Sequence, residues 1–140
     1  MQPNKACAVV LDDAGRLLLF RHPRGDVQLV KGTIEANESP ARAVLRELKE
    51  ESGITPARVL RDLGCWKAGY RGQVWSFHLC ATDLALPEQW SYQTEDDNGH
   101  VFAFFWAPLD DLPFDECHPL FQRALREVLD RLQNASPGVG

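Results

Sequence analysis

The sequence predicts a single α/β domain in which a mixed β-sheet lies between helices. Short apolar runs typical of strands recur along the chain, and two longer segments carry apolar residues at helical spacing. These segments alternate irregularly, which favours a mixed sheet. The chain has 140 residues, 44% of them hydrophobic, enough for one domain with its own core. We expect that domain to span residues 1–134, followed by a flexible tail at 135–140.

The N-terminal part of the chain is expected to form short strands. Residues 6–11 and 16–20 are apolar runs separated by an Asp-Asp-Ala-Gly sequence. Asp and Gly are typical of tight turns, so we predict a β-hairpin here. A loop at 22–26 leads to a short apolar piece at 27–30, and residues 31–37 are expected to be irregular.

The strongest helix signal lies between Ser39 and Gly53. Ser39 is a favourable N-cap, and Pro40 suits the first helical position because its missing N–H costs no hydrogen bond there. Gly53 suits the left-handed conformation that ends many helices. Pro56 then prevents the helix from continuing.

Strands are predicted again after this helix. Residues 59–63, 65–70 and 74–82 have strand-like composition, and Arg71 and Gly72 are expected to form the turn before the last of them.

The C-terminal part is expected to contain a loop, a strand and a helix. The polar, acidic segment 84–99 is predicted to be a long loop. Residues 101–106 form a continuous apolar run, which is typical of a strand buried on both faces. A second amphipathic helix is predicted over 119–132.

Charge and cysteine content narrow the functional classes. The net charge of −5 argues against a nucleic-acid partner, which usually requires a basic surface. No apolar run approaches the roughly 18 residues of a membrane helix, and the N-terminus lacks a signal-peptide pattern. The 4 cysteines form no CxxC pair and are typical of reduced thiols. We therefore expect a cytoplasmic protein without a membrane partner.

Three glutamates share one face of the first predicted helix. With Glu47 at zero and about 100° per residue, Glu51 lies at roughly 40° and Glu50 at roughly −60°. Like charges at these spacings repel by about 0.2–0.5 kcal/mol per pair. A hard cation such as Mg²⁺ or Mn²⁺ would relieve this repulsion, because such ions prefer oxygen ligands. A solvated face of glutamates is the other interpretation that these residues leave open.

The segment from Gly32 to Ile54 resembles the Nudix box, G-x5-E-x7-R-E-U-x-E-E-x-G-U, where U is a bulky aliphatic residue. It reads GTIEANESPARAVLRELKEESGI, with Leu48 and Ile54 at the aliphatic positions. The fixed positions are all filled, by Gly32, Glu38, Arg46, Glu47, Glu50, Glu51 and Gly53. The resemblance implies a Nudix-type α/β/α sandwich. It also implies a hydrolase that uses Mg²⁺ or Mn²⁺ to cleave a diphosphate linkage in a nucleoside diphosphate derivative.

The resemblance assigns roles to individual residues. Arg46 is implied to orient a box glutamate through charge-assisted hydrogen bonds. Glu38 is implied to support the metal site from the corner between loop and helix, and Gly32 to let the loop backbone approach the metal. The implied metal ligands are three carboxylates and one backbone carbonyl, those of Glu47, Glu50, Glu51 and Lys31.

Nudix enzymes commonly place a further acid or base on a loop outside the box. Here the candidates are Glu95, Asp96 and Asp97, with His100 as a substitute. A carboxylate at this place could bind the metal or accept a proton from the attacking water. We expect Glu95 to be the catalytic one, while a solvated turn is the alternative.

Three residues outside the box are expected to contact the substrate. Tyr70 resembles a tyrosine associated with diadenosine polyphosphate hydrolases, and it could stack on a base. Arg24 and Arg71 are candidate phosphate contacts. Tyr70 and the Lys31-Gly32 pair, which also resembles the sequence of such hydrolases, favour a dinucleoside polyphosphate as the small-molecule substrate. A structural tyrosine at the sheet edge is the other interpretation of Tyr70. The alternatives are ADP-ribose or a nucleotide sugar, a nucleoside triphosphate, an RNA 5′ end, and a nucleotide-sensing module without activity. A homodimer is compatible with the sequence.

Overall fold

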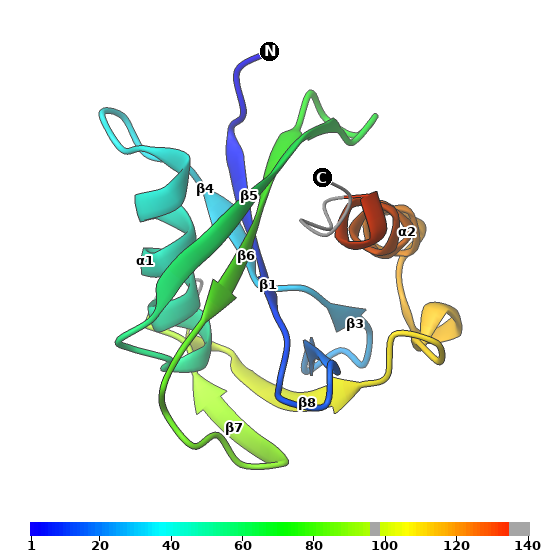
Figure 1. The fold of residues 1–140 in the computed structure, drawn as a ribbon. Helices are drawn as coiled ribbons and strands as arrows, with labels where there is room; N and C mark the ends of the chain where they lie inside the picture. The colour runs from blue at the N-terminus through cyan, green and yellow to red at the C-terminus, as the bar shows by residue number, and fades with distance from the viewer. Residues whose placement is uncertain (96–98, 135–140) are drawn as a thin grey trace.

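A computed structural model describes residues 1–95 and 99–134 of the chain (Figure 1). The strands form two four-stranded sheets, with the orders β4-β1-β6-β5 and β3-β2-β8-β7. Helices α1 (Pro40–Ser52) and α2 (Pro119–Asn134) lie on opposite sides of the strands. The predicted α/β fold with helices on both sides is therefore confirmed, and its strands are divided between two sheets.

The first sheet is mixed. It consists of β4 (Lys31–Thr33), β1 (Lys5–Val10), β6 (Val74–Ala81) and β5 (Arg58–Lys67). Strand β1 runs parallel to β6 and antiparallel to β4, and β5 runs antiparallel to β6. Two irregularities in the register of β5 against β6 lie within one strand, where the sequence predicted two.

The second sheet is antiparallel throughout. It consists of β3 (Val27–Gln28), β2 (Leu17–Arg21), β8 (Val101–Ala107) and β7 (Gln89–Gln93). A short 3₁₀ helix, η2 (Phe114–Glu116), follows this sheet and precedes α2.

The predicted hairpin of the first two strands is wrong. Strands β1 and β2 enter different sheets, and one isolated bridge between Leu11 and Leu17 joins them at the turn. Both strands are buried along nearly their whole length, because each lies between two neighbouring strands of its sheet. The turn residues place the reversal of the chain, but they do not decide which strands pair.

Two further strands lie where the sequence predicted irregular structure. Strand β4 falls in segment 31–37, and β7 falls in the predicted loop 84–99. In β7 the aromatic residues Trp90 and Tyr92 are partly buried, while the residues that alternate with them are exposed. This period of two is a strand signal, which the polar and acidic surroundings obscured.

Strand β8 is not buried on both faces as predicted. Val101 is 51% exposed, whereas Phe102 and Phe104 are buried at 3% and 1%. The strand alternates in its first half, so a continuous apolar run did not identify a strand covered on both sides.

Helix α1 begins and ends where the sequence predicted. Ser39 Oγ accepts a hydrogen bond from the Arg42 backbone N–H at 3.2 Å. Gly53 has φ of +79°, and its N–H donates to the Lys49 carbonyl at 2.9 Å. A Cβ at position 53 would come within 2.6 Å of the Tyr92 ring, so the close approach of β7 also requires glycine there.

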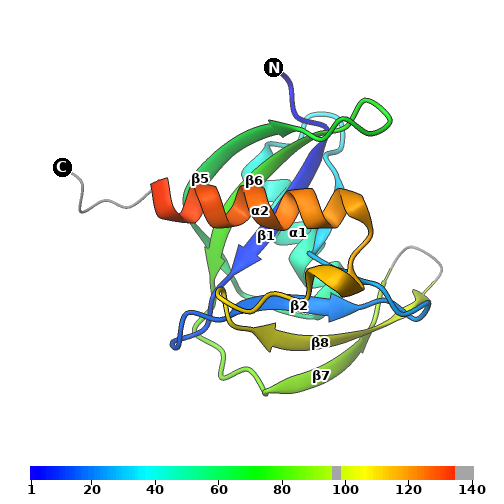
Figure 2. The same cartoon turned by 90° about the vertical axis from the view of Figure 1, so that its right-hand side faces the viewer.

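Each helix covers its own apolar cluster. Val44 and Leu48 of α1 pack in one cluster with Phe104, and α2 packs on a second cluster that contains Trp75 and Phe77. Figure 2 shows α2 lying across the first sheet. Within the described residues, neither helix is long and apolar enough to cross a membrane. The tail expected at 135–140 lies outside these residues.

Candidate active site

Helix α1 and strand β4 border a cleft of about 530 Å³ that holds the box carboxylates. We call it the carboxylate cleft. Its lining comes from the start of β1, from β4 and the loop after it, and from one face of α1. The lining residues are Lys5, Lys31, Gly32, Thr33, Glu35, Arg46, Glu47, Glu50 and Glu51. The three glutamates that the sequence placed on one helix face therefore line one cavity.

Arg46 is the centre of the hydrogen-bond network in this cleft. Its Nε and Nη2 donate to the two carboxylate oxygens of Glu38 at 2.7 and 2.9 Å. Its Nη1 donates to Glu47 at 2.8 Å and to Glu50 at 3.2 Å. Nη2 also donates to the Thr33 carbonyl at 2.9 Å. One guanidinium thus fixes three box glutamates and the end of strand β4, because its planar fork presents several donors at once.

The Arg46 guanidinium lowers the pKa of the Glu38 carboxyl from its ordinary value of 4.5 to about 2. The Glu35 backbone N–H adds to this effect, since it donates to Glu38 at 3.0 Å. In return, the Glu38 carboxylate raises the pKa of Arg46. Glu38 therefore stays ionised and keeps Arg46 in place over the whole physiological pH range.

The Glu38–Arg46 pair is expected to make stability sensitive to acid. A lowered carboxyl pKa stabilises the folded state above pH 4.5, and that contribution is lost as pH falls through about 2. The stability difference between wild type and Glu38→Gln should therefore shrink as the pH falls from about 6 to about 3, measured by urea unfolding. Glu35→Gln serves as control, because the Glu35 side chain is 66% exposed and 3.6 Å from Arg46. A Glu38→Gln difference that stays constant with pH would contradict the assignment.

Glu47 is the most buried of the three glutamates that share one face of α1, with 4% of its surface exposed. Its carboxylate lies against the backbone of Gly32, so that a Cβ at position 32 would overlap it. The glycine thus lets strand β4 approach the Glu47 carboxylate directly. The approach to a metal that was predicted for Gly32 stays a prediction.

The donor chemistry of the cleft fits a hard divalent cation. Carboxylates and a backbone carbonyl are the ligands that Mg²⁺ and Mn²⁺ prefer. Among residues 1–95 and 99–134, no three His, Cys, Asp or Glu side chains are placed to share one ion. Arg46 Nη1, which donates to both Glu47 and Glu50, occupies the space between these carboxylates. Binding of a cation would therefore require rearrangement of the glutamate side chains around Arg46.

The predicted loop acid lies at the C-terminal end of α1. The backbone N–H of Glu95 donates to the Glu50 carbonyl at 3.1 Å, and the Glu95 side chain is exposed. His100 lies beside His22, with ring centroids 5.0 Å apart, and its carbonyl accepts a hydrogen bond from the Thr94 N–H. The other two candidates, Asp96 and Asp97, lie outside the described residues.

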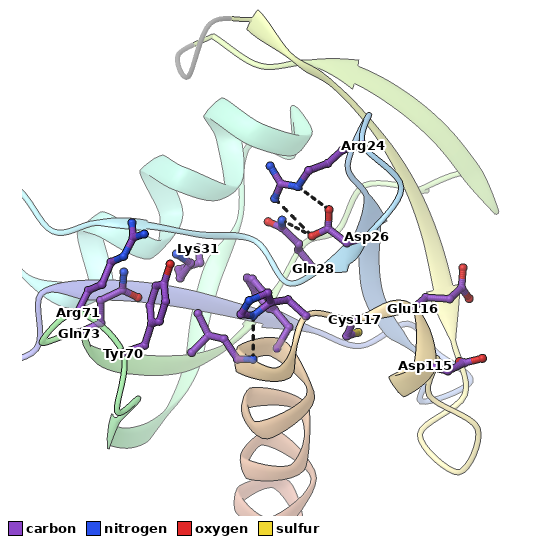
Figure 3. Close-up of a pocket in the computed structure, with 13 residues that line it drawn as sticks. Arg24, Asp26, Gln28, Lys31, Tyr70, Arg71, Gln73, Asp115, Glu116 and Cys117 are labelled. Atoms are coloured by element: carbon purple, nitrogen blue, oxygen red, sulfur yellow. Dashed lines mark hydrogen bonds and ion pairs between the residues drawn. The ribbon is translucent and has the colours of Figure 1, made fainter.

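The three predicted substrate contacts line a second cavity, of about 600 Å³. We call it the nucleoside pocket, after the prediction that Tyr70 stacks on a base. Tyr70 carries the Arg71 guanidinium over its ring at 4.9 Å, and Figure 3 shows both beside Gln73. Arg24 Nε lies 2.8 Å from Asp26, whose other oxygen accepts a hydrogen bond from Gln28 at 2.8 Å. Aromatic and cationic side chains thus meet in a cavity of a size that fits a small ligand.

Lys31 lines both cavities. It starts strand β4, and it borders the carboxylate cleft together with Gly32 and Thr33. Its ammonium lies 5.2 Å from the ring centroid of Trp75 and 5.9 Å from that of Phe121. Burial lowers the pKa of this ammonium. The two cavities therefore adjoin along one short strand.

Comparison with known proteins identifies the family. The sequence matches the profile of the NUDIX domain over residues 1–132. The chain belongs to the NUDIX family. Two similar relatives are both named RNA pyrophosphohydrolase. The one from Halorhodospira halophila is 29% identical, over 94% of this chain and 82% of its own length. The one from Saccharophagus degradans is 29% identical, over 86% and 81%.

Solved structures of NUDIX proteins share the fold. An ADP-ribose pyrophosphatase from Streptococcus suis superposes with a TM-score of 0.72 and 20% identity, covering 97% of this chain and 95% of that one. A MutT NUDIX hydrolase from Burkholderia pseudomallei superposes with a TM-score of 0.63 and 27% identity, covering 91% and 99%. The predictions of a Nudix fold and of a pyrophosphohydrolase are confirmed by these comparisons.

One feature of this NUDIX site was missed at the level of sequence. The prediction used the Lys31 carbonyl, whereas the structure also places the Lys31 ammonium against Trp75 and Phe121. Trp75 and Phe121, which hold it, lie on β6 and α2. No local signal could have found this placement, because it depends on contacts between distant parts of the chain.

Proposed function

We propose that this chain hydrolyses a diphosphate linkage in a nucleoside diphosphate derivative, with Mg²⁺ or Mn²⁺ held by the box carboxylates. The observation that supports this proposal is the shared wall of the two cavities. Lys31, the first residue of strand β4, lines both the carboxylate cleft and the nucleoside pocket, in which aromatic, cationic and acidic side chains meet. A ligand with its base in the pocket could therefore extend its phosphates into the cleft.

Each residue of the site has a separate role in this reaction. Glu47, Glu50, Glu51 and the Lys31 carbonyl would hold the cation, which neutralises phosphoryl oxygens and activates water when bound. Arg46 orients two of these carboxylates, and its own position is fixed by Glu38. Glu95 would accept the proton of the attacking water, supported by the hydrogen bond between its backbone and the end of α1.

A dinucleoside polyphosphate is the substrate that the nucleoside pocket favours. Tyr70 offers a ring for stacking, and Arg24, Lys31 and Arg71 supply positive charge for phosphates. A second candidate is the 5′ end of RNA, which is favoured by relatives named RNA pyrophosphohydrolase. The net charge of −5 counts against a long nucleic-acid contact.

A substrate panel tests the proposal. Diadenosine polyphosphates, ADP-ribose, nucleotide sugars, nucleoside triphosphates and triphosphorylated RNA would be incubated with Mg²⁺, Mn²⁺ or chelator. We expect chelator-sensitive cleavage, fastest for the dinucleoside polyphosphates. Faster cleavage of triphosphorylated RNA would favour the second candidate. Nucleotide binding without turnover of any substrate would instead support a sensing module.

Tyr70→Ala is expected to raise KM for the preferred substrate by about tenfold, because stacking of a base on an aromatic ring contributes roughly 1–3 kcal/mol. Tyr70→Phe keeps the ring and should leave KM close to that of the wild type. Steady-state kinetics on both variants measures the effect. An unchanged KM in Tyr70→Ala would mean that this tyrosine only supports the connection between β5 and β6.

We also propose a cytoplasmic location. The four cysteines are free thiols in the structure, three of them buried, and such thiols are typical of a reducing compartment. Fractionation of cells that express the protein would test this assignment.

A further inference from the structure

The Lys31 ammonium is half-buried and lies against aromatic rings. Its Nζ contacts the faces of Trp75 and Phe121, at 5.2 and 5.9 Å from the ring centroids. Trp75 is fully buried and Phe121 is 5% exposed. Glu51 and Glu47 act on this charge at longer range and offset part of the cost of its burial. A half-buried ammonium is costly without an anionic partner.

The neighbouring arginine binds most of the carboxylates around the cleft. Arg46 binds Glu38, Glu47 and Glu50 and lies 3.6 Å from Glu35. Four carboxylates on α1 or on the loop before it are therefore directed toward Arg46. Arg46 and Lys31 therefore have different surroundings. Arg46 forms several ion pairs with carboxylates, whereas the Lys31 ammonium lies on aromatic rings.

The position of the Lys31 ammonium indicates which anion it binds. Lys31 lines both the carboxylate cleft and the nucleoside pocket. Figure 3 shows it on the side of the pocket where Tyr70, Arg71 and Gln73 lie, apart from the hydrogen-bonded group of Arg24, Asp26 and Gln28. An anion bound here would lie between the base-stacking residues and the box glutamates.

We propose that the Lys31 ammonium binds the diphosphate group of the substrate where it passes from the nucleoside pocket into the carboxylate cleft. This inference rests on the proposed function and names the residue that binds the substrate between the nucleoside pocket and the carboxylate cleft. A lysine suits the task, because its compact charge binds phosphate without a fixed orientation. The Trp75 and Phe121 rings hold the ammonium in place by cation–π attraction and leave its N–H donors for the ligand.

Binding to metal-free protein tests this role separately from catalysis. Inorganic pyrophosphate, ADP and adenosine would be titrated calorimetrically into wild type, Lys31→Met and Lys67→Met in the presence of chelator. Lys31→Met keeps the backbone carbonyl and fills the space between the rings. Lys67 is the matched control, because it is exposed at the end of β5. Lys31→Gln provides a second variant, and thermal unfolding confirms that each variant is folded.

Lys31→Met is expected to bind pyrophosphate and ADP about ten- to a hundredfold more weakly than wild type, as for the loss of a charged hydrogen bond. Its affinity for adenosine, and all affinities of Lys67→Met, should be unchanged. The inference is overturned if wild type binds pyrophosphate no more tightly than Lys31→Met, or if adenosine affinity falls by the same factor. If the substrate panel shows no hydrolysis while the pyrophosphate difference persists, the proposed function fails and the phosphate-binding role of Lys31 stands.

Discussion

Replacement of Glu50 or Glu51 by glutamine is expected to reduce kcat by about a hundredfold or more, with the protein still folded. Residues that merely support metal ligands typically contribute 10–100-fold to affinity or activity, so the loss of a ligand carboxylate should cost at least about that much. Folding should be unaffected, because Gln has the same shape as Glu and the change removes one of three like charges on a helix face. Both side chains lie at the surface of the cleft rather than in the core.

Glu127→Gln is the matched control for these variants. Glu127 also lies on a helix and accepts a hydrogen bond from an arginine, Arg131, at 3.1 Å, but it lies outside the carboxylate cleft. Turnover of the preferred substrate at saturating Mg²⁺ and the unfolding midpoint would be measured for all three variants. Near-native turnover in either Glu50→Gln or Glu51→Gln would show that the metal-ligand assignment is wrong.

The elements that the sequence predicted well depend on short-range interactions. The ends of α1 follow from Ser39, Pro40 and Gly53, which act within one helical turn. The turn at Arg71 and Gly72 was also predicted, and both residues adopt positive φ. Such features are set by neighbours in the chain, so the rest of the fold need not be known.

Strand pairing could not be predicted in the same way. The Asp-Asp-Ala-Gly turn suggested that β1 and β2 pair, yet β1 lies between β4 and β6 in a different sheet. The choice of neighbours depends on which apolar faces can be buried together across the whole chain. Strand β7 was missed because Trp90 and Tyr92 pack against residues from β8 and α1, and those contacts are not visible in a polar local sequence.

In the candidate site, too, the short-range features could be predicted and the long-range contacts could not. The spacing of Glu47, Glu50 and Glu51 on one helix face needs helical geometry alone, and the three line one cleft. The partners of the Lys31 side chain come from β6 and α2, at sequence distances that no motif spans. The network around Arg46 is intermediate, because Glu38 lies eight residues before it at a fixed box position, while the detailed hydrogen bonding required the structure.

Arg46→Met is expected to destabilise the protein by about 3 kcal/mol, because removal of one partner leaves a buried charge uncompensated. Glu47 is 4% exposed and accepts its hydrogen bond from Arg46. Glu38 would lose both of its bonds to the guanidinium, and the loop carbonyl of Thr33 would lose its donor. The methionine preserves most of the aliphatic packing of the arginine side chain, so the loss reports mainly on charge and hydrogen bonding.

Arg42→Met separates this effect from a general response of the helix. Arg42 lies one turn earlier on α1 and is exposed, so its replacement should change stability by less than about 0.5 kcal/mol. Urea unfolding at neutral pH measures both variants. A loss in Arg46→Met comparable to that in Arg42→Met would mean that the Glu47 carboxylate does not depend on Arg46. In that case the orienting role of Arg46 would have to be abandoned, because a cation that contributes nothing to holding Glu47 cannot be what positions it for a metal.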